Sequence, residues 1–254
     1  MSITAVPRGA HLTRRLFQLY VGLALYGASS ALLVRAGLGL EPWGVLHQGL
    51  AERTGLSIGV VSIVVGATVL LLWIPIRQRP GLGTVSNVFA VGIAMDGTLA
   101  LVPDVHGLAA RIAVMTAGVV VNGVATGLYI AARFGPGPRD GLMTGLHLRT
   151  GRSIRLVRTL IEVAVVATGF LLGGTLGAGT VVYALAIGPL AQFFLRFFAV
   201  GGNAATGAGA VTEVAETGTG TGDAAAESAV VAPAPDGGET TVTARTPEQA
   251  ILPQ

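Results

Sequence analysis

The stretch Gly39-Leu-Glu-Pro-Trp-Gly-Val-Leu-His-Gln-Gly-Leu-Ala-Glu-Arg-Thr-Gly-Leu-Ser-Ile58 decides the fold, because it occurs twice. Shifted by 96 residues, it returns as Gly135-Pro-Gly-Pro-Arg-Asp-Gly-Leu-Met-Thr-Gly-Leu-His-Leu-Arg-Thr-Gly-Arg-Ser-Ile154, with ten of the twenty positions identical. The shared motif includes Pro42, Gly49, Arg53 and Gly55, matched by Pro138, Gly145, Arg149 and Gly151. Glycines on either side keep the same offset, so residues 16–102 and 112–199 are predicted to be two copies of one unit.

Composition indicates a membrane protein. Hydrophobic residues make up 52% of the chain and charged residues only 11%, far from the balance of soluble domains. The apolar residues form runs long enough to cross the hydrocarbon core as helices. Six spans are predicted, at residues 16–34, 56–76, 82–102, 112–132, 159–176 and 179–199. The expected fold is therefore all-α and polytopic.

The arginines predict how the spans are oriented. Every basic residue is Arg, and in short loops Arg marks the cytoplasmic side. With a cytoplasmic N-terminus (residues 1–15), twelve arginines fall inside and three outside. Three spans per unit is an odd number, so the second unit is expected to be inverted relative to the first, as in many secondary transporters. Residues 200–254 lack any apolar period and are expected to form a disordered cytoplasmic tail.

Each repeated stretch predicts a short extra helix. Pro42 and Pro138 suit the first turn of a helix, and the glycines at 55 and 151 suit its end. Ser57 and Ser153 then suit the N-caps of the spans that follow. Two placements stay open: the short helices lie on the membrane faces, or they dip inward so that their ends frame one site.

Six residues are the candidate lining of such a site. Trp43, His47, Arg139 and Asp140 belong to the short helices, and the flanking spans contribute Asp96 and Gln192. An acid within a span usually faces the bundle interior, although Asp96 can also be a helix-end acid that faces water. His47 suits proton coupling by its titration range, or it is simply a solvated histidine.

Three arginines form a basic cluster before the fifth span. Arg152, Arg155 and Arg158 follow one another at every third position, which superficially resembles a voltage sensor, but Gly151 interrupts the pattern. Contact with anionic lipid headgroups is the favoured interpretation. The basic balance then follows from membrane topology, and a nucleic-acid partner is not expected.

No catalytic pattern is found in the sequence. The chain contains no cysteine, which excludes disulfides and thiolate metal sites. It has neither a phosphate-binding loop nor a nucleophile elbow, and its histidines are too scattered for metal-ligand spacing. No cofactor, metal or enzymatic activity is expected, and the oligomeric state is not readable.

The motifs carry a family resemblance over about residues 12–198. Pro42-Trp43-x-x-Leu46-His47-Gln48-Gly49-Leu50, together with Gly137-Pro138-Arg139-Asp140-Gly141-Leu142-Met143, is similar to sequences of the YczE/YyaS/YitT-type integral membrane proteins. The resemblance implies a bacterial plasma-membrane location but no reaction. Many such proteins carry Asp or Asn after the Pro-Trp pair, where Gly44 stands here; the acid occurs in the second copy, as Asp140.

Two functions stay open on the sequence alone. The first is a small inverted-repeat transporter or exporter of an unknown small solute. The second is a non-transporting accessory protein that scaffolds a membrane complex. A central cavity lined by charged groups favours the first, and a solid apolar interface between the repeats favours the second.

Overall fold

The computed structural model describes residues 8–198, and within them every regular element is an α-helix. The helices are α1 (Arg8–Ala36), α2 (Pro42–Thr54), α3 (Ile58–Ile76), α4 (Leu82–Leu101), α5 (Leu108–Ala131), α6 (Pro138–Thr150), α7 (Ile154–Leu171) and α8 (Ala178–Phe198). The all-helical fold class is confirmed. The expected tail, residues 200–254, lies outside the described residues.

The two halves of the chain share several element boundaries. Adding 96 to the bounds of α2 gives the bounds of α6, and the starts of α3 and α4 map in the same way onto those of α7 and α8. Local chemistry explains the agreement. Gly55 and Gly151 end the short helices in left-handed conformations, with φ of 72° and 66°. Ser57 and Ser153 then cap α3 and α7, each accepting a bond from a backbone N–H three residues later.

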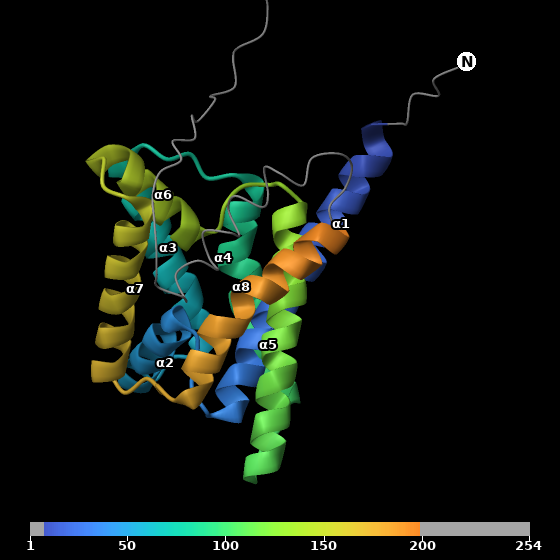
Figure 1. The fold of residues 1–254 in the computed structure, drawn as a ribbon, viewed down its shortest axis with the longest axis vertical. Helices are drawn as coiled ribbons and strands as arrows, with labels where there is room; N and C mark the ends of the chain where they lie inside the picture. The colour runs from blue at the N-terminus through green and yellow to red at the C-terminus, as the bar shows by residue number, and fades with distance from the viewer. Residues whose placement is uncertain (1–7, 199–254) are drawn as a thin grey trace, which may run out of the picture. The chain divides into compact units, whose positions relative to one another are not determined.

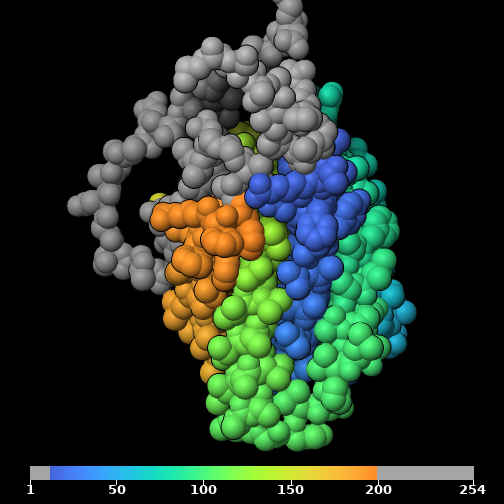
Figure 2. All heavy atoms as spheres, turned by 90° about the vertical axis from the view of Figure 1, so that its right-hand side faces the viewer, coloured from blue at the N-terminus to red at the C-terminus, as the bar shows by residue number. Residues whose placement is uncertain are grey.

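The helices form two layers. Figure 2 shows α8, α5, α1 and α4 side by side, and this order agrees with the pairwise contacts of these helices. The second layer contains α7, α6, α3 and α2, on the left of Figure 1. There α2 packs on α7 and α3 packs on α6, while α3 also packs on α4 and so joins the layers.

The central contact of the first layer is the antiparallel pair α1 and α5. Arg15, near the start of α1, donates to the carbonyl oxygens of Ala132 and Arg133 at the end of α5. Arg111, near the start of α5, donates to the carbonyl oxygens of Ala36 and Gly37 at the end of α1. Each guanidinium therefore caps the carboxyl end of the other helix, where unpaired carbonyls collect.

Glycines allow the helices of the second layer to approach closely. A Cβ on Gly169 of α7 would lie 2.5 Å from the backbone nitrogen of Leu46 in α2. At the equivalent contact between α3 and α6, the glycine is Gly141 on α6, and it packs against the indole of Trp73 on α3. A Cβ on Gly141 would lie 2.0 Å from that indole. Trp73 is fully buried, and its side chain lies between α3 and α6. At the corresponding contact, Gly169 lets α7 lie directly against the backbone of α2. The two contacts correspond in sequence, but they are packed differently.

Five helices in the described part are long and apolar enough to cross a membrane: α1 from Leu12, α3, α4, α5 and α8. The sequence predicted six. The helix at the remaining position, α7, ends at Leu171 instead of 176, and it contains three charged residues, Arg155, Arg158 and Glu162. The first helix also differs from its expected span, since α1 begins at Arg8 rather than at residue 16. Membrane embedding and lipid contact follow from these long, outward-facing apolar helices.

Candidate functional site

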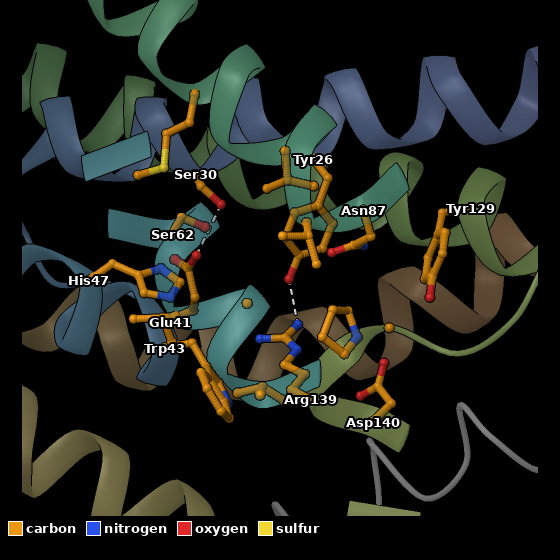
Figure 3. A pocket seen from close by; sticks show the side chains of 18 residues that line it. Tyr26, Ser30, Glu41, Trp43, His47, Ser62, Asn87, Tyr129, Arg139 and Asp140 are labelled. Atoms are coloured by element: carbon orange, nitrogen blue, oxygen red, sulfur yellow. Dashed lines mark hydrogen bonds between the residues drawn. The ribbon is translucent and has the colours of Figure 1, made fainter. Parts of the chain in front are cut away.

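A cavity of about 100 Å³ lies where the amino-terminal ends of α2 and α6 meet. Figure 3 shows that side chains reach it from both short helices, and α1, α3, α4 and α5 complete its wall. The two short helices come from different halves of the chain, so each half supplies one of the helix ends. The cavity is smaller than the 300–1,000 Å³ typical of sites for drug-sized ligands. In this state it suits a small ion, a small solute or a group of waters.

Glu41 is a buried acid of the cavity. It is the N-cap of α2 and is only 5% exposed. One carboxylate oxygen, Oε1, accepts a 3.0 Å bond from the hydroxyl of Ser30 on α1. The other, Oε2, is buried and has no hydrogen-bond partner among residues 8–198. Gly44 makes room for this carboxylate, because a Cβ at that position would lie 3.0 Å from Glu41 Cδ.

Trp43 contributes a buried donor beside this acid. Its side chain is 8% exposed and packs with Val69, Trp73 and Leu142 from α3 and α6. The indole Nε1 is buried without a partner in the described part of the chain. Trp73, by contrast, uses its indole N–H to donate a 3.0 Å bond to the carbonyl of Pro138. Trp43 thus differs from Trp73 in keeping its indole N–H unpaired within residues 8–198.

Arg139 is the cation of the cavity. It occupies the position on α6 that Trp43 occupies on α2, and it donates to the hydroxyl of Tyr26 on α1. Its guanidinium carbon also lies 5.8 Å from the centre of the Tyr26 ring, within cation–π range. The neighbouring Asp140 is exposed, and its carboxylate folds back over Gly137.

His47 lies one helical turn after Trp43 and lines the same cavity. Burial, and then the positive charge of Arg139, lower its pKa to about 4. The imidazole is therefore neutral near pH 7, where it offers one donor and one acceptor nitrogen. It adds polarity to the wall without adding a charge.

The six predicted lining residues separate into two groups. Trp43, His47, Arg139 and Asp140 all line the cavity. Asp96 lies elsewhere: its carboxylate accepts bonds from the Ser57 hydroxyl and the Gly59 backbone N–H, which caps the start of α3. Gln192 lies on α8, outside the cavity lining.

The repeated arginines and the basic cluster are also away from the cavity. Arg53 donates to the carbonyl oxygen of Leu172, at the carboxyl end of α7. Arg149, Arg152 and Arg155 are exposed, and Arg158 forms an ion pair of 3.2 Å with Glu162 one turn later. These side chains hold or surround the second layer, and none of them lines the cavity.

Sequence reasoning missed much of the polar lining. The candidate residues did not include Glu41, nor did they include Tyr26, Ser30 and Asn87, which lie within apolar spans. One signal was available. At the 96-residue offset, Tyr26 corresponds to Asn122 and Asn87 to Tyr183, so the same two residue types exchange between the copies. In the second copy they bond directly, with Tyr183 donating to Asn122 over 3.0 Å.

The chemistry of the site favours binding over catalysis. The cavity brings together a carboxylate, a guanidinium, a neutral imidazole and an indole donor, which can recognise a small polar molecule. No two of them form the nucleophile and general-base pair that covalent catalysis requires. Within residues 8–198, no group of three or more His, Asp or Glu side chains could hold a metal ion.

Comparison with known proteins places the chain among membrane proteins. An uncharacterized protein of Haemophilus influenzae is 39% identical over 71% of this chain and 83% of its own length. The uncharacterized membrane protein YczE of Bacillus subtilis is 30% identical over 69% of this chain and 83% of its own. The uncharacterized protein YyaS of the same organism is 25% identical over 69% and 89%. No solved structure matches this chain.

The matched region coincides with the helices described above. Residues 13–196 match DUF6198, a family of unknown function, and they include both short helices and every residue of the cavity. The resemblance to YczE-type and YyaS-type proteins is thus confirmed by direct similarity to both. The chain belongs to the DUF6198 family of membrane proteins.

Proposed function

We propose that this protein is a secondary transporter of a small polar solute in the bacterial plasma membrane, with the cavity between α2 and α6 as its binding site. The observation that carries the proposal is the buried Glu41 carboxylate, which lines the cavity and has one oxygen unpaired within residues 8–198. An unsatisfied buried acceptor lowers the stability of the fold by about 1–3 kcal/mol. In a protein that serves only as a scaffold, no ligand would offset this loss.

The proposal includes an inverted repeat. Reciprocal contacts support it: Gly83 donates to the carbonyl of Phe134, and Gly179 donates to that of Leu38, each over 2.9 Å. Adding 96 to 83 gives 179, and subtracting 96 from 134 gives 38. Each bond therefore becomes the other when every residue is replaced by its equivalent in the other half. A two-fold axis between the halves requires this reciprocity. Since α1 and α5 run antiparallel, that axis lies in the membrane plane, and the repeats have opposite orientations.

The sixth span of this scheme is α7. Its three charges lie in its first half, where Arg158 is paired with Glu162 at the membrane boundary. The second half carries exposed apolar side chains, including Phe170 at 57% and Leu171 at 77% exposure. A helix of this kind fits the bilayer with its charged end at the headgroups, next to the basic cluster Arg152, Arg155 and Arg158. The arginine bias places both termini in the cytoplasm.

In this scheme the two short helices enter the bilayer from opposite faces and meet at the midplane. Transporters of this kind place a solute at such broken-helix ends and open it to each side in turn. Asp140 is exposed while Trp43 is buried, so the cavity is closer to opening on the α6 side. That is the cytoplasmic side in the proposed orientation. No ATP-binding loop occurs in the sequence, so the driving force is a gradient.

Cysteine accessibility tests the proposal, because the chain has no native cysteine. Single variants Arg79→Cys and His106→Cys mark the loops expected inside and outside. Variants Trp43→Cys and Asp140→Cys report on the cavity. A membrane-impermeant maleimide is added to right-side-out or inside-out vesicles, and the rate of labelling is measured for each variant.

We expect Arg79→Cys to label only from the cytoplasmic side and His106→Cys only from the outer side. Asp140→Cys should label from the cytoplasmic side, and Trp43→Cys should label more slowly from both sides. Labelling of both loop markers from one side would refute the inverted arrangement. Failure of Trp43→Cys to label from either side would show that the cavity never opens, and the transporter proposal would then be wrong.

A further inference from the structure

Two buried groups of opposite character belong to residues that line the same cavity. Glu41 Oε2 is an acceptor without a donor, and Trp43 Nε1 is a donor without an acceptor, within the described residues. Both side chains are more than nine-tenths buried. Buried polar atoms in native proteins are nearly always satisfied by protein, water or ligand. A ligand that satisfies both must therefore present a donor at one end and an acceptor at the other.

The charges of the wall indicate what those two ends are. The hydrogen-bond partner of Glu41 is the neutral hydroxyl of Ser30, and no cation among residues 8–198 bonds directly to the carboxylate. Burial of an uncompensated charge is costly, so a positively charged donor is favoured there. Arg139 also lines the cavity, donates to the Tyr26 hydroxyl and has the Asp140 carboxylate as its neighbour on α6. Its guanidinium and the Trp43 N–H together suit a carboxylate.

The arrangement separates the two charges. Figure 3 shows Glu41 and Arg139 reaching the cavity from the starts of α2 and α6, with Trp43 nearby. Within residues 8–198, Glu41 and Arg139 form no ion pair with each other. The ion pairs of Arg35 with Asp104 and of Arg158 with Glu162 lie elsewhere. A carboxylate and a guanidinium held apart in one small cavity are complementary to a molecule that carries both charges.

Size limits the candidates. The volume of about 100 Å³ is smaller than the roughly 150 Å³ cavity that accepts benzene in an engineered protein. It exceeds the roughly 10–15 Å³ that a cavity needs in order to hold one water. Amino acids with bulky side chains are therefore excluded in this state, and the smallest zwitterions fit.

We propose that the cavity binds a small zwitterion of the glycine type. Its ammonium group lies against the carboxylate of Glu41 and the hydroxyl of Ser30. Its carboxylate accepts from the indole N–H of Trp43 and from Arg139. The claim that this zwitterion is also transported rests on the function proposed above, whereas the binding claim rests on the cavity alone.

Equilibrium binding of radiolabelled glycine to the purified full-length protein tests the inference. Saturable binding, rather than thermal stabilisation, is the measurement, because glycine in bulk stabilises proteins without a site. The competitors are unlabelled glycine, which carries both charges, methylammonium, which carries only the positive charge, and acetate, which carries only the negative charge. The variants are Glu41→Gln and Trp43→Phe, with Glu52→Gln as the matched control. Glu52 is exposed at the other end of the same helix and outside the cavity.

We expect saturable glycine binding that unlabelled glycine displaces at least about tenfold more effectively than methylammonium or acetate. Glu41→Gln and Trp43→Phe should each weaken binding at least about tenfold, and Glu52→Gln should not. Each variant is checked for folding by its elution volume and by its unfolding temperature. If Glu41→Gln does not fold, Trp43→Phe and the competition series decide the question.

Three results would overturn the inference. Methylammonium competing as well as glycine would define a cation site, and acetate competing as well would define an anion site. No saturable glycine binding would define a cavity filled by water. The function proposed above fails separately: glycine binding without glycine flux in proteoliposomes refutes transport of this ligand but leaves the site intact.

Discussion

Arg15 and Arg111 cap the carboxyl ends of each other's helices across the centre of the molecule. Arg15 Nε lies 3.0 Å from the carbonyl oxygen of Ala132, and Arg111 Nε lies 2.6 Å from that of Ala36. Both the donors and the acceptors are separated by 96 positions in the chain, since 15 plus 96 is 111 and 36 plus 96 is 132. The pair was not recognised in the sequence, although both arginines are visible there at the repeat offset. Its geometry ties α1 to α5 at both ends.

The first prediction follows from this reciprocity. Arg15→Gln and Arg111→Gln should each lower the free energy of unfolding by about 1 kcal/mol, because each removes a cation from a helix carboxyl end. Chemical unfolding of the purified protein in detergent measures both. Arg14→Gln is the control, because Arg14 is exposed beside Arg15 and would lose the same charge. A large effect of one variant and none of the other would contradict the equivalence of the two ends.

The second prediction concerns the packing of Trp73 on Gly141. A Cβ on Gly141 would lie 2.0 Å from the indole, so Gly141→Ala forces the ring or the helix to move. Overpacking of this kind costs about 1–3 kcal/mol. Gly97→Ala is the matched control on α4, where a Cβ meets nothing within 4 Å. The control should be neutral or stabilising, since Ala is the better helix former by about 1 kcal/mol.

A double-mutant cycle then assigns the cost to the contact. Trp73→Phe provides space at Gly141, so Gly141→Ala should cost less in that background than in the wild type. Equal costs in both backgrounds would show that the indole is not what opposes the added methyl group.

The boundaries of the short helices were predictable because the signals are local. Pro42 starts α2 and Gly55 ends it, and the same residues recur in the second copy. The convergence of Glu41, Trp43 and Arg139 was only partly predictable, because it depends on contacts between segments about 100 residues apart. Asp96 illustrates the limit: an acid within an apolar span suggested the bundle interior, but Ser57 and Gly59 from the preceding helix bind it. Nothing in the spacing of residue 96 and residue 57 reveals that contact.

The third prediction separates this capping role of Asp96 from a role in ligand binding. Asp96→Ala removes the acceptor of two bonds at the start of α3 and should lower the free energy of unfolding by about 1–3 kcal/mol. Glycine binding by the folded variant should keep its wild-type affinity, because Asp96 is outside the cavity. A folded Asp96→Ala protein with binding weakened tenfold would place this acid in the ligand site instead.

The fourth prediction concerns the acid at the start of each short helix. In α2 the acid is the N-cap, Glu41, and the third helical residue is Gly44; in α6 the N-cap is Gly137 and the third residue is Asp140. In both helices the carboxylate covers the α-carbon of the glycine. A Cβ would lie 3.0 Å from Glu41 Oε2 in α2, and 2.9 Å from Asp140 Oδ2 in α6. Each helix end thus has room for one carboxylate, which can come from either position.

The single variant Gly44→Asp should therefore destabilise the protein by at least about 1 kcal/mol, because a second side chain and a second negative charge enter the space that Glu41 fills. The double variant Glu41→Gly with Gly44→Asp reproduces the arrangement of α6 and should recover most of that loss. The double variant should still not bind glycine. Its aspartate is shorter than Glu41 and is attached at position 44, so it cannot both bond to Ser30 and place a free oxygen in the cavity. Recovery of stability without recovery of binding would separate the two roles of Glu41, at the helix end and at the ligand. Full recovery of binding would show that a carboxylate from either position serves the site. Failure to recover stability would refute the conclusion that each helix end has room for one carboxylate, which can come from either position.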